Sequence, residues 1–494
     1  MKSPLYKTSA KDIAQKVSRG ELSAEKIADY FAKRIDTFDK TIGCLLLNLC
    51  DRAKEKAKQI DDKRAKGEPL GRLAGVPIIL KDNIHIRGQT TTCASKMLQN
   101  YVAPFDATVT KLIEAEDGII LGKSNLDEFA MGSSTEYSAF CATYNPWNLR
   151  CTAGGSSGGS AVAAAAGLCP IALGSDTGGS VRQPGSFCGI YGYKPTYGRV
   201  SRFGLVAFGS SLDQIGPFAR SIEDIALIME ILGRPCNQDS TSYQQPPEPY
   251  LDELDVSIQG KTIGIPYSIF EGKLDPQVRK AFDLAIDVYK SLGCKIKEIE
   301  LPMLKYSIPI YYIIATAEAS TNLARFDGIR YTHRAKEAET LEQVYEMSRN
   351  EGFGPEVKQR ILLGTYVLSS GYQDAYYRKA QRIRTLLIQE YKTAFKECDL
   401  IAMPTSPTTA FELGAIQDPV AMYLQDAFTI SANMAGIPAI NIPAGFDDQK
   451  KPIGLQLQGP QFSDGRVMRF AHHFEKATQF ARQFPPEFDR EVNA

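Results

Sequence analysis

The chain has 494 residues, 57 basic and 57 acidic side chains, and 43% hydrophobic residues. This composition is typical of a globular enzyme with a substantial core. The zero net charge argues against a protein that binds nucleic acid by itself, so another subunit would have to bind any RNA partner. The polar N-terminus lacks a signal peptide's apolar core, and the longest nearly apolar run, 161–174, is too short to span a bilayer. We therefore expect a cytoplasmic protein with no membrane segment.

The ten cysteines are scattered along the chain, and no two have C-x-x-C spacing. This pattern argues against a zinc or redox site. We expect most of the thiols to be buried as small apolar side chains, without structural disulfides.

The first half of the chain passes from helical to alternating patterns. Residues 1–65 are predicted to be helical, with Ser23 as the N-cap of SAEKIADYFAKRI. From about 66 to 233 strands and helices alternate. An apolar strand over 76–80 ends at Lys81, and Asp106 is predicted to cap a helix that ends near residue 116. The strand GIILGK, a helix over 161–167 and a buried strand over 169–174 follow.

The second half begins with a polar, Pro- and Gln-rich stretch, 234–260, which predicts an exposed connection. KTIGIP and CKIKEIEL are predicted strands, and between them Asp275-Pro276 begins a helix that ends near Gly293. Residues 305–400 are mainly helical in pattern, and AINIPAG and IGLQLQG are strands again. Alternating strands and helices predict an α/β fold with a sheet covered on both faces.

Two Gly/Ser clusters lie within residues 152–192, TAGGSSGGSAVAAAAGLCPIALGSDTGGSVRQPGSFCGIYG. Glycine-rich turns allow close backbone approach and can bind anions. A flexible linker is disfavoured, because an Ala-rich helix and an apolar strand lie between the clusters. A phosphate loop is a weak alternative, since the nearest fragment, Gly122-Lys123-Ser124, has Asp117 in place of the first glycine.

A serine hydrolase with a histidine base is a further alternative. The segment around Ser156 matches G-x-S-x-G, and His472 and His473 lie late in the chain. That motif needs a strand before its turn, and NLRCT, which precedes it, is a poor strand by pattern. The adjacent histidines also fit an ordinary helix surface.

A lysine can also supply the base. Ser180 lies on a Thr-Gly-Gly-Ser turn, whose N–H groups, those of Thr177, Gly178 and Gly179 among them, can bind an oxyanion. A serine hydroxyl is a weak nucleophile until a base takes its proton. Lys81, at the end of an apolar strand, can be neutralised by burial and act as that base.

Three segments, LAGVPIILKDN, GGSSGGSAVAAAAG and GSDTGGSVRQPGSFCG, together resemble the amidase signature family, over nearly the whole chain. The resemblance implies one domain over 1–494 with a central mixed β-sheet covered by helices on both faces. It also implies a relay in which Lys81 accepts a proton from Ser156, which bridges to the nucleophile Ser180. The peptide bond before Ser156 would be cis.

Further segments, such as DEFAMGSSTEYSAF and EASTNLARFDGIRYTHR, resemble one branch of that family, the glutaminase subunits of tRNA-dependent glutamyl/aspartyl amidotransferases. The resemblance implies that this chain needs no cofactor or metal. Ammonia would pass to the B subunit of such an enzyme, which uses ATP and magnesium to amidate misacylated tRNA, and a small C subunit would join the two. Whether the acceptor is Glu-tRNA, Asp-tRNA or both stays open.

The same branch implies how free glutamine would be held. Arg360 would bind the α-carboxylate and Asp426 the α-ammonium, with Ser133 and Tyr311 lining the site. An arginine suits a carboxylate because its donors form a bidentate fork. A free-standing amidase for small amides and a non-catalytic scaffold remain the alternatives. The intact Lys81 and serines argue against the scaffold.

Overall fold

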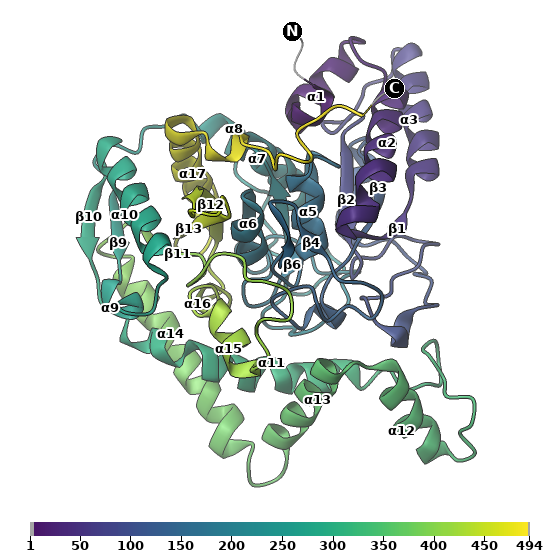
Figure 1. Cartoon of the computed structure of the whole chain (residues 1–494), viewed down its shortest axis with the longest axis vertical. Coiled ribbons are helices and arrows are strands. Elements are labelled where there is room, and N and C mark those ends of the chain that lie inside the picture. The colour runs from purple at the N-terminus through teal and green to yellow at the C-terminus, as the bar shows by residue number, and fades with distance from the viewer. Residues whose placement is uncertain (1–3, 493–494) are drawn as a thin grey trace.

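A single eleven-stranded sheet runs through the computed structural model, which describes residues 4–492 (Figure 1). Neighbouring strands pair in both parallel and antiparallel fashion, so the predicted mixed sheet is confirmed. From one edge to the other the order is β1 (Leu45–Asn48), β3 (Ile119–Ser124), β2 (Pro77–Lys81), β6 (Ile171–Asp176), β8 (Gln214–Ala219), β7 (Tyr191–Lys194), β12 (Ala439–Phe446), β13 (Pro452–Gln458), β11 (Leu400–Pro404), β9 (Thr262–Ile265) and β10 (Lys295–Glu298).

Helices cover both faces of this sheet, as predicted. Two helices pack against one face, α5 (Gly158–Ala165) and α6 (Arg182–Cys188). Three others pack together on the opposite face, α4 (Thr108–Ala115), α7 (Ile222–Leu232) and α17 (Asp464–Thr478).

The N-terminal region is mostly helical, with α1 (Ala10–Ser18), α2 (Ala24–Ile42) and α3 (Cys50–Ala65). The prediction of an all-helical segment was wrong at β1, where LLLN pairs antiparallel with β3 as an edge strand. A run of four residues is too short for its own periodicity to separate strand from helix. The pairing with β3, more than seventy positions later, decides it.

Two of the three predicted helix caps are confirmed. Ser23 accepts a hydrogen bond from the Lys26 N–H, and Asp275 caps α10 (Pro276–Ser291). The prediction that Asp106 caps a helix was wrong, because α4 begins at Thr108 and its N-cap residue is Ala107. The Asp106 carboxylate instead accepts the Arg87 N–H at 2.7 Å, a contact with a different loop.

Three segments differ from the patterns read along the chain. NLRCT, which is a poor strand by pattern, does form a strand, β5 (Asn148–Thr152), and pairs with β4 (Tyr144–Asn145) in a small separate sheet. Helix α5 starts at the glycines, three residues before the predicted start. The connection over 234–260 is mostly exposed but holds a short helix, α8 (Tyr250–Glu253), that buries Tyr250.

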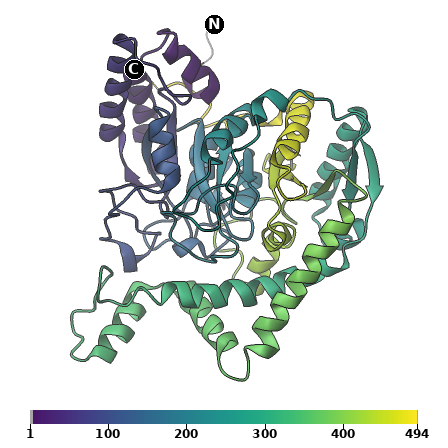
Figure 2. The same cartoon turned by 180° about the vertical axis from the view of Figure 1, so that it is seen from behind.

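A helical segment extends along one end of the sheet, beneath it in Figure 1 and seen from behind in Figure 2. The helices of this segment are α11 (Ser307–Leu323), α12 (Leu341–Gly352), α13 (Pro355–Leu368) and α14 (Lys379–Ala394). Two of them, α11 and α13, supply candidate site residues.

All ten cysteines are free thiols, and within residues 4–492 no helix is both long and apolar enough to cross a bilayer.

Candidate active site

The predicted catalytic segments meet at the carboxyl ends of two interior strands of the sheet. Strands β2 and β6 are parallel neighbours, so their carboxyl ends, at Lys81 and Asp176, point the same way. The Thr-Gly-Gly-Ser turn follows β6 directly, and the start of α5 lies beside it. Carboxyl ends of parallel strands are where α/β sheets place their ligand sites.

Lys81 is fully buried among serine hydroxyls. Its Nζ lies 2.8 Å from Ser156 Oγ, 2.8 Å from Ser157 Oγ and 3.0 Å from Ser175 Oγ. Burial lowers the pKa of Lys81 to about 7, although the carboxylates of nearby aspartates oppose this shift. A lysine with such a pKa is substantially neutral near pH 7 and can accept a proton.

The Gly155–Ser156 peptide bond is cis, as the resemblance implied. Gln183 braces it: its Oε1 accepts the Gly155 N–H at 2.9 Å, and its Nε2 donates to the Ser133 carbonyl at 3.0 Å. The sequence analysis missed Gln183. No local pattern marks it, because its partners lie 28 and 50 positions away.

Asp176 organises the turn that carries Ser180, and it too was missed. Its carboxylate accepts the N–H groups of Gly179 at 2.9 Å and Val181 at 3.2 Å. It also pairs with Arg182, whose Nε and Nη2 lie at 3.0 and 2.9 Å. Burial acts to raise the pKa of Asp176, but the Arg182 guanidinium outweighs it and the pKa falls to about 2. The carboxylate therefore stays ionised and holds the turn.

Ser180 lies next to the lysine–serine group with its hydroxyl uncommitted. The Ser180 carbonyl accepts the Ser157 N–H at 3.2 Å, and 8% of the residue is exposed, enough to meet a substrate. Within residues 4–492 its hydroxyl makes no hydrogen bond, so the Ser156–Ser180 step of the relay stays a prediction.

The predicted oxyanion donors differ among themselves. The Gly179 N–H is already engaged by Asp176, which removes it from the free donors. In the described part of the chain, the N–H groups of Thr177, Gly178 and Ser180 make no hydrogen bond. These three remain available to a developing oxyanion.

The structure brings two of the predicted substrate residues into contact. Ser133 donates a hydrogen bond to the carboxylate of Asp426, 293 positions away. Thr429 Oγ1 lies 2.7 Å from the Gly178 carbonyl and 3.1 Å from the backbone carbonyl of Asp426, which links the backbone at Asp426 to the turn that carries Ser180. Burial raises the pKa of Asp426 to about 7, so a cationic partner would favour its ionised form.

The other two predicted substrate residues, Tyr311 and Arg360, come from helices α11 and α13 of the helical segment. A Cβ at Gly178 would lie 2.7 Å from the Tyr311 ring, so only glycine fits beneath that tyrosine. Arg360 is buried, donates to Glu356 at 2.8 Å, and lies 5.3 Å from the centre of the Tyr312 ring.

The histidines of the alternative lie elsewhere, on α17. The His472 ring pairs with Asp255 at 3.3 Å and the His473 ring with the Val256 carbonyl at 3.0 Å. Although β5 does precede Ser156, no histidine contacts Ser156 or Ser180 in the described residues. The buried amine in contact with Ser156 is that of Lys81.

Replacing both His472 and His473 by alanine is expected to leave amide hydrolysis active, because neither ring reaches the serines. The measurement is the steady-state rate of the double variant, with its melting temperature as the control for folding. A folded but inactive double variant would favour the histidine mechanism over the lysine relay.

The pattern of the Amidase family matches residues 26–468. The chain belongs to the amidase family. The A subunit of a glutamyl-tRNA(Gln) amidotransferase from Protochlamydia amoebophila is 55% identical over 490 residues, covering 99% of this chain and all of that one. Its counterpart of the same name from Carboxydothermus hydrogenoformans is 50% identical over 482 residues, 97% of this chain and 99% of the relative.

Solved amidase structures share this fold. The A subunit of a glutamyl-tRNA(Gln) amidotransferase from Thermotoga maritima is 40% identical, covers 98% of each chain and has a TM-score of 0.81. A bacterial aryl acylamidase of the amidase signature family has a TM-score of 0.85 at 24% identity, covering 97% of this chain and 98% of its own, which shows the fold alone.

Proposed function

We propose that this amidase is the glutamine-hydrolysing A subunit of a tRNA-dependent amidotransferase. Full-length similarity to the A subunit of a glutamyl-tRNA(Gln) amidotransferase, 55% identical over 99% of the chain, carries the proposal. The buried Lys81–Ser156 contact supports amide hydrolysis, and the buried Arg360 and Asp426 support a zwitterionic substrate.

In the proposed reaction the neutral Lys81 amine takes the Ser156 proton as Ser156 takes that of Ser180. The Ser180 oxygen attacks the side-chain amide carbon of glutamine, and the resulting oxyanion accepts hydrogen bonds from free N–H groups of the turn. The relay returns a proton to the amide nitrogen, the C–N bond breaks and ammonia leaves. Water then hydrolyses the Ser180 ester to give glutamate.

The substrate's two charges account for two groups that the relay does not use. The α-carboxylate pairs with Arg360, and the α-ammonium pairs with Asp426, whose orientation Ser133 sets. Ionising a buried carboxyl costs free energy, and a bound ammonium offsets that cost. A neutral small amide offers neither charge, so this arrangement favours glutamine over the substrates of a free-standing amidase.

The ammonia is used by a second protein of the complex. The B subunit holds ATP, magnesium and the misacylated Glu- or Asp-tRNA, and a small C subunit joins the two chains. This chain carries 57 basic and 57 acidic residues, so it lacks the basic excess with which a protein alone binds tRNA. The tRNA is therefore held mainly by the partner.

Replacing Arg360 by alanine is expected to weaken the use of glutamine by about ten- to a hundredfold, since a lost charged hydrogen bond typically costs about 1.5–3 kcal/mol. The kcat/KM for a small neutral amide should change much less. Lys358→Ala, on the same helix, is the matched control, because this lysine is only half-buried and its Nζ hydrogen-bonds the Asn350 side chain. Equal losses on both substrates would show that Arg360 is structural.

The partnership is tested by comparing glutaminase rates with and without the other components. The isolated chain is expected to hydrolyse glutamine slowly, and the complex with the B and C subunits, ATP and misacylated tRNA to do so faster. Coupling between sites is typically worth about 1–3 kcal/mol, or roughly five- to 150-fold. A full rate in the isolated chain, unchanged by partners or tRNA, would instead identify a free-standing amidase.

A further inference from the structure

Arg360, which is proposed to bind the carboxylate of glutamine, is held through one nitrogen of its guanidinium. Its Nε donates to Glu356 Oε1 at 2.8 Å, and within residues 4–492 neither Nη1 nor Nη2 makes a hydrogen bond. The residue is only 4% exposed, yet neither Nη atom is one of the fully enclosed polar atoms that lack a partner. Both Nη atoms therefore face open space, and together they form the fork that matches a carboxylate.

The residue that holds Arg360, Glu356, lies one turn earlier on α13, and its side chain is 8% exposed. Its Oε1 also accepts the hydroxyl of Tyr423, at 3.4 Å, from α15 (Pro419–Tyr423). Ion pairs between residues four apart on a helix usually lie on the surface, where they contribute little. Because this pair is buried, the carboxylate can fix the rotation of the guanidinium as well as balance its charge.

Three aromatic rings surround the guanidinium of Arg360. Its central carbon lies 5.3 Å from the ring centre of Tyr312, 5.6 Å from that of Phe208 and 5.7 Å from that of Tyr423. The Tyr312 and Tyr423 rings stack on each other, with their centres 3.8 Å apart. The rings limit sideways movement of the guanidinium, and Glu356 supplies the directional contact.

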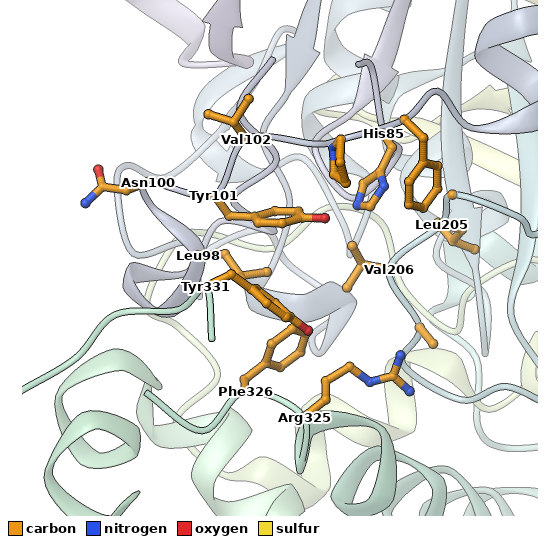
Figure 3. A pocket seen from close by; sticks show the side chains of 14 residues that line it. His85, Leu98, Asn100, Tyr101, Val102, Leu205, Val206, Arg325, Phe326 and Tyr331 are labelled. Atoms are coloured by element: carbon orange, nitrogen blue, oxygen red, sulfur yellow. The ribbon is translucent and has the colours of Figure 1, made fainter. Parts of the chain in front are cut away.

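The cavity drawn in Figure 3 is a separate space. It has a volume of about 700 Å³ and is lined by His85 and by residues within 98–105, 204–207 and 325–331. Neither Arg360 nor Glu356 lines it. The orientation of Arg360 is therefore set by Glu356 and the three rings, and not by the residues of that cavity.

Contacts join this arginine to the reacting end of the site. The Tyr312 ring lies 5.1 Å from the Tyr311 ring, and Tyr311 in turn lies against Gly178 of the nucleophile turn. Burial raises the pKa of Asp426 to about 7, and the charge of Arg360 opposes that shift, so the two groups act on each other. A substrate held by Arg360 is thus placed relative to the turn, and a small change in the direction of the guanidinium moves the amide carbon.

We propose that Glu356 is a positioning residue for glutamine: it holds Arg360 Nε so that Nη1 and Nη2 are presented together to the α-carboxylate. The inference rests on the proposed function and adds a residue to the same site. Its content is the contact and not the charge. A carboxylate in the first turn of α13 could also act by its charge alone, by stabilising the helix, and that role predicts the opposite response to substitution.

Two conservative substitutions separate the contact from the charge. Glu356→Gln keeps the length and an acceptor oxygen but loses the charge, whereas Glu356→Asp keeps the charge on a side chain one methylene shorter. We expect Glu356→Asp to raise the KM for glutamine by about tenfold with little change in kcat. Glu356→Gln should keep this KM within about threefold of the wild type. The kcat/KM for a small neutral amide should change little in either variant.

The measurement is the steady-state kinetics of the purified complex on both substrates, with melting temperature as the test of folding. The reverse order, a normal KM in Glu356→Asp and a raised KM in Glu356→Gln, would show that Glu356 acts by its charge and would overturn the proposal. Equal losses on glutamine and the neutral amide would also overturn it. In an Arg360→Ala background, Glu356→Asp should cause no further loss, because no guanidinium remains to be oriented.

Asp374→Ala is the matched control. Asp374 also lies four residues before an arginine, Arg378, and pairs with it at 3.0 Å, but both side chains are exposed. Its kinetics should equal those of the wild type. If Arg360→Ala is not selective for glutamine, the proposed function fails and this inference fails with it. If Arg360→Ala is selective and Glu356→Asp is normal, this inference alone is wrong.

Discussion

Ser180→Ala is expected to abolish glutamine hydrolysis while leaving the fold intact. The variant removes the oxygen that would form the acyl-enzyme, and no other serine hydroxyl occupies that position on the turn. Loss of a nucleophile that acts within a relay typically costs at least about four orders of magnitude in kcat. The measurement is glutamate release by the purified complex, with melting temperature as the test of folding.

A matched control is available on the adjacent helix α6. Ser186 is also buried, and it lies six residues after the nucleophile, outside the relay. Ser186→Ala should therefore retain activity, and a glutamine-like electrophile should label the wild type and this control but not Ser180→Ala. Glutaminase activity of Ser180→Ala within tenfold of the wild type would show that the nucleophile is another group.

The complex that carries Ser180→Ala separates ammonia production from its use. External ammonium should still support amidation of misacylated tRNA by this complex, because the change removes only the source of ammonia. Failure of both glutamine and ammonium would indicate damage to the assembly rather than to the chemistry.

Lys81→Met is expected to lower kcat by about two to four orders of magnitude, the usual contribution of a general base. Methionine has a similar length and no charge, so it fills the buried space without placing an unpaired charge there. Ser156→Ala should also be damaging, although a water molecule in its place would restore part of the relay. A Lys81→Met enzyme with near-normal kcat would exclude lysine as the base.

The pH profile gives an independent test of Lys81. Its pKa lies at about 7, and the neutral form accepts the proton. The rate of the wild type should therefore rise with pH through about 7 and level off above it, and fall as the amine becomes protonated below it. The residual rate of Lys81→Met should lose this step. A step that persists in the variant would belong to another group.

Where contacts are local, the sequence was a sound guide. Ser23 and Asp275 cap helices whose first N–H groups lie two or three residues away, so the pattern contains both partners. The apolar strand that ends at Lys81 and the turn before Ser180 are also short-range features. The assignment of Lys81 to Ser156, by contrast, came from resemblance, since spacing alone does not say that two groups 75 residues apart will meet.

Composition and the strand and helix periodicity by themselves determined the α/β class, and the Gly/Ser motifs marked the candidate catalytic segments. Only the tertiary structure decided that Asp106 contacts Arg87 and caps no helix, that NLRCT is a strand, and that Gly179 is not a free donor. It also joined Ser133 to Asp426 and Gln183 to the loop before Ser156. Local periodicity reports which face of an element is buried, whereas these contacts depend on which elements the packed sheet brings together, and that is a property of the whole chain.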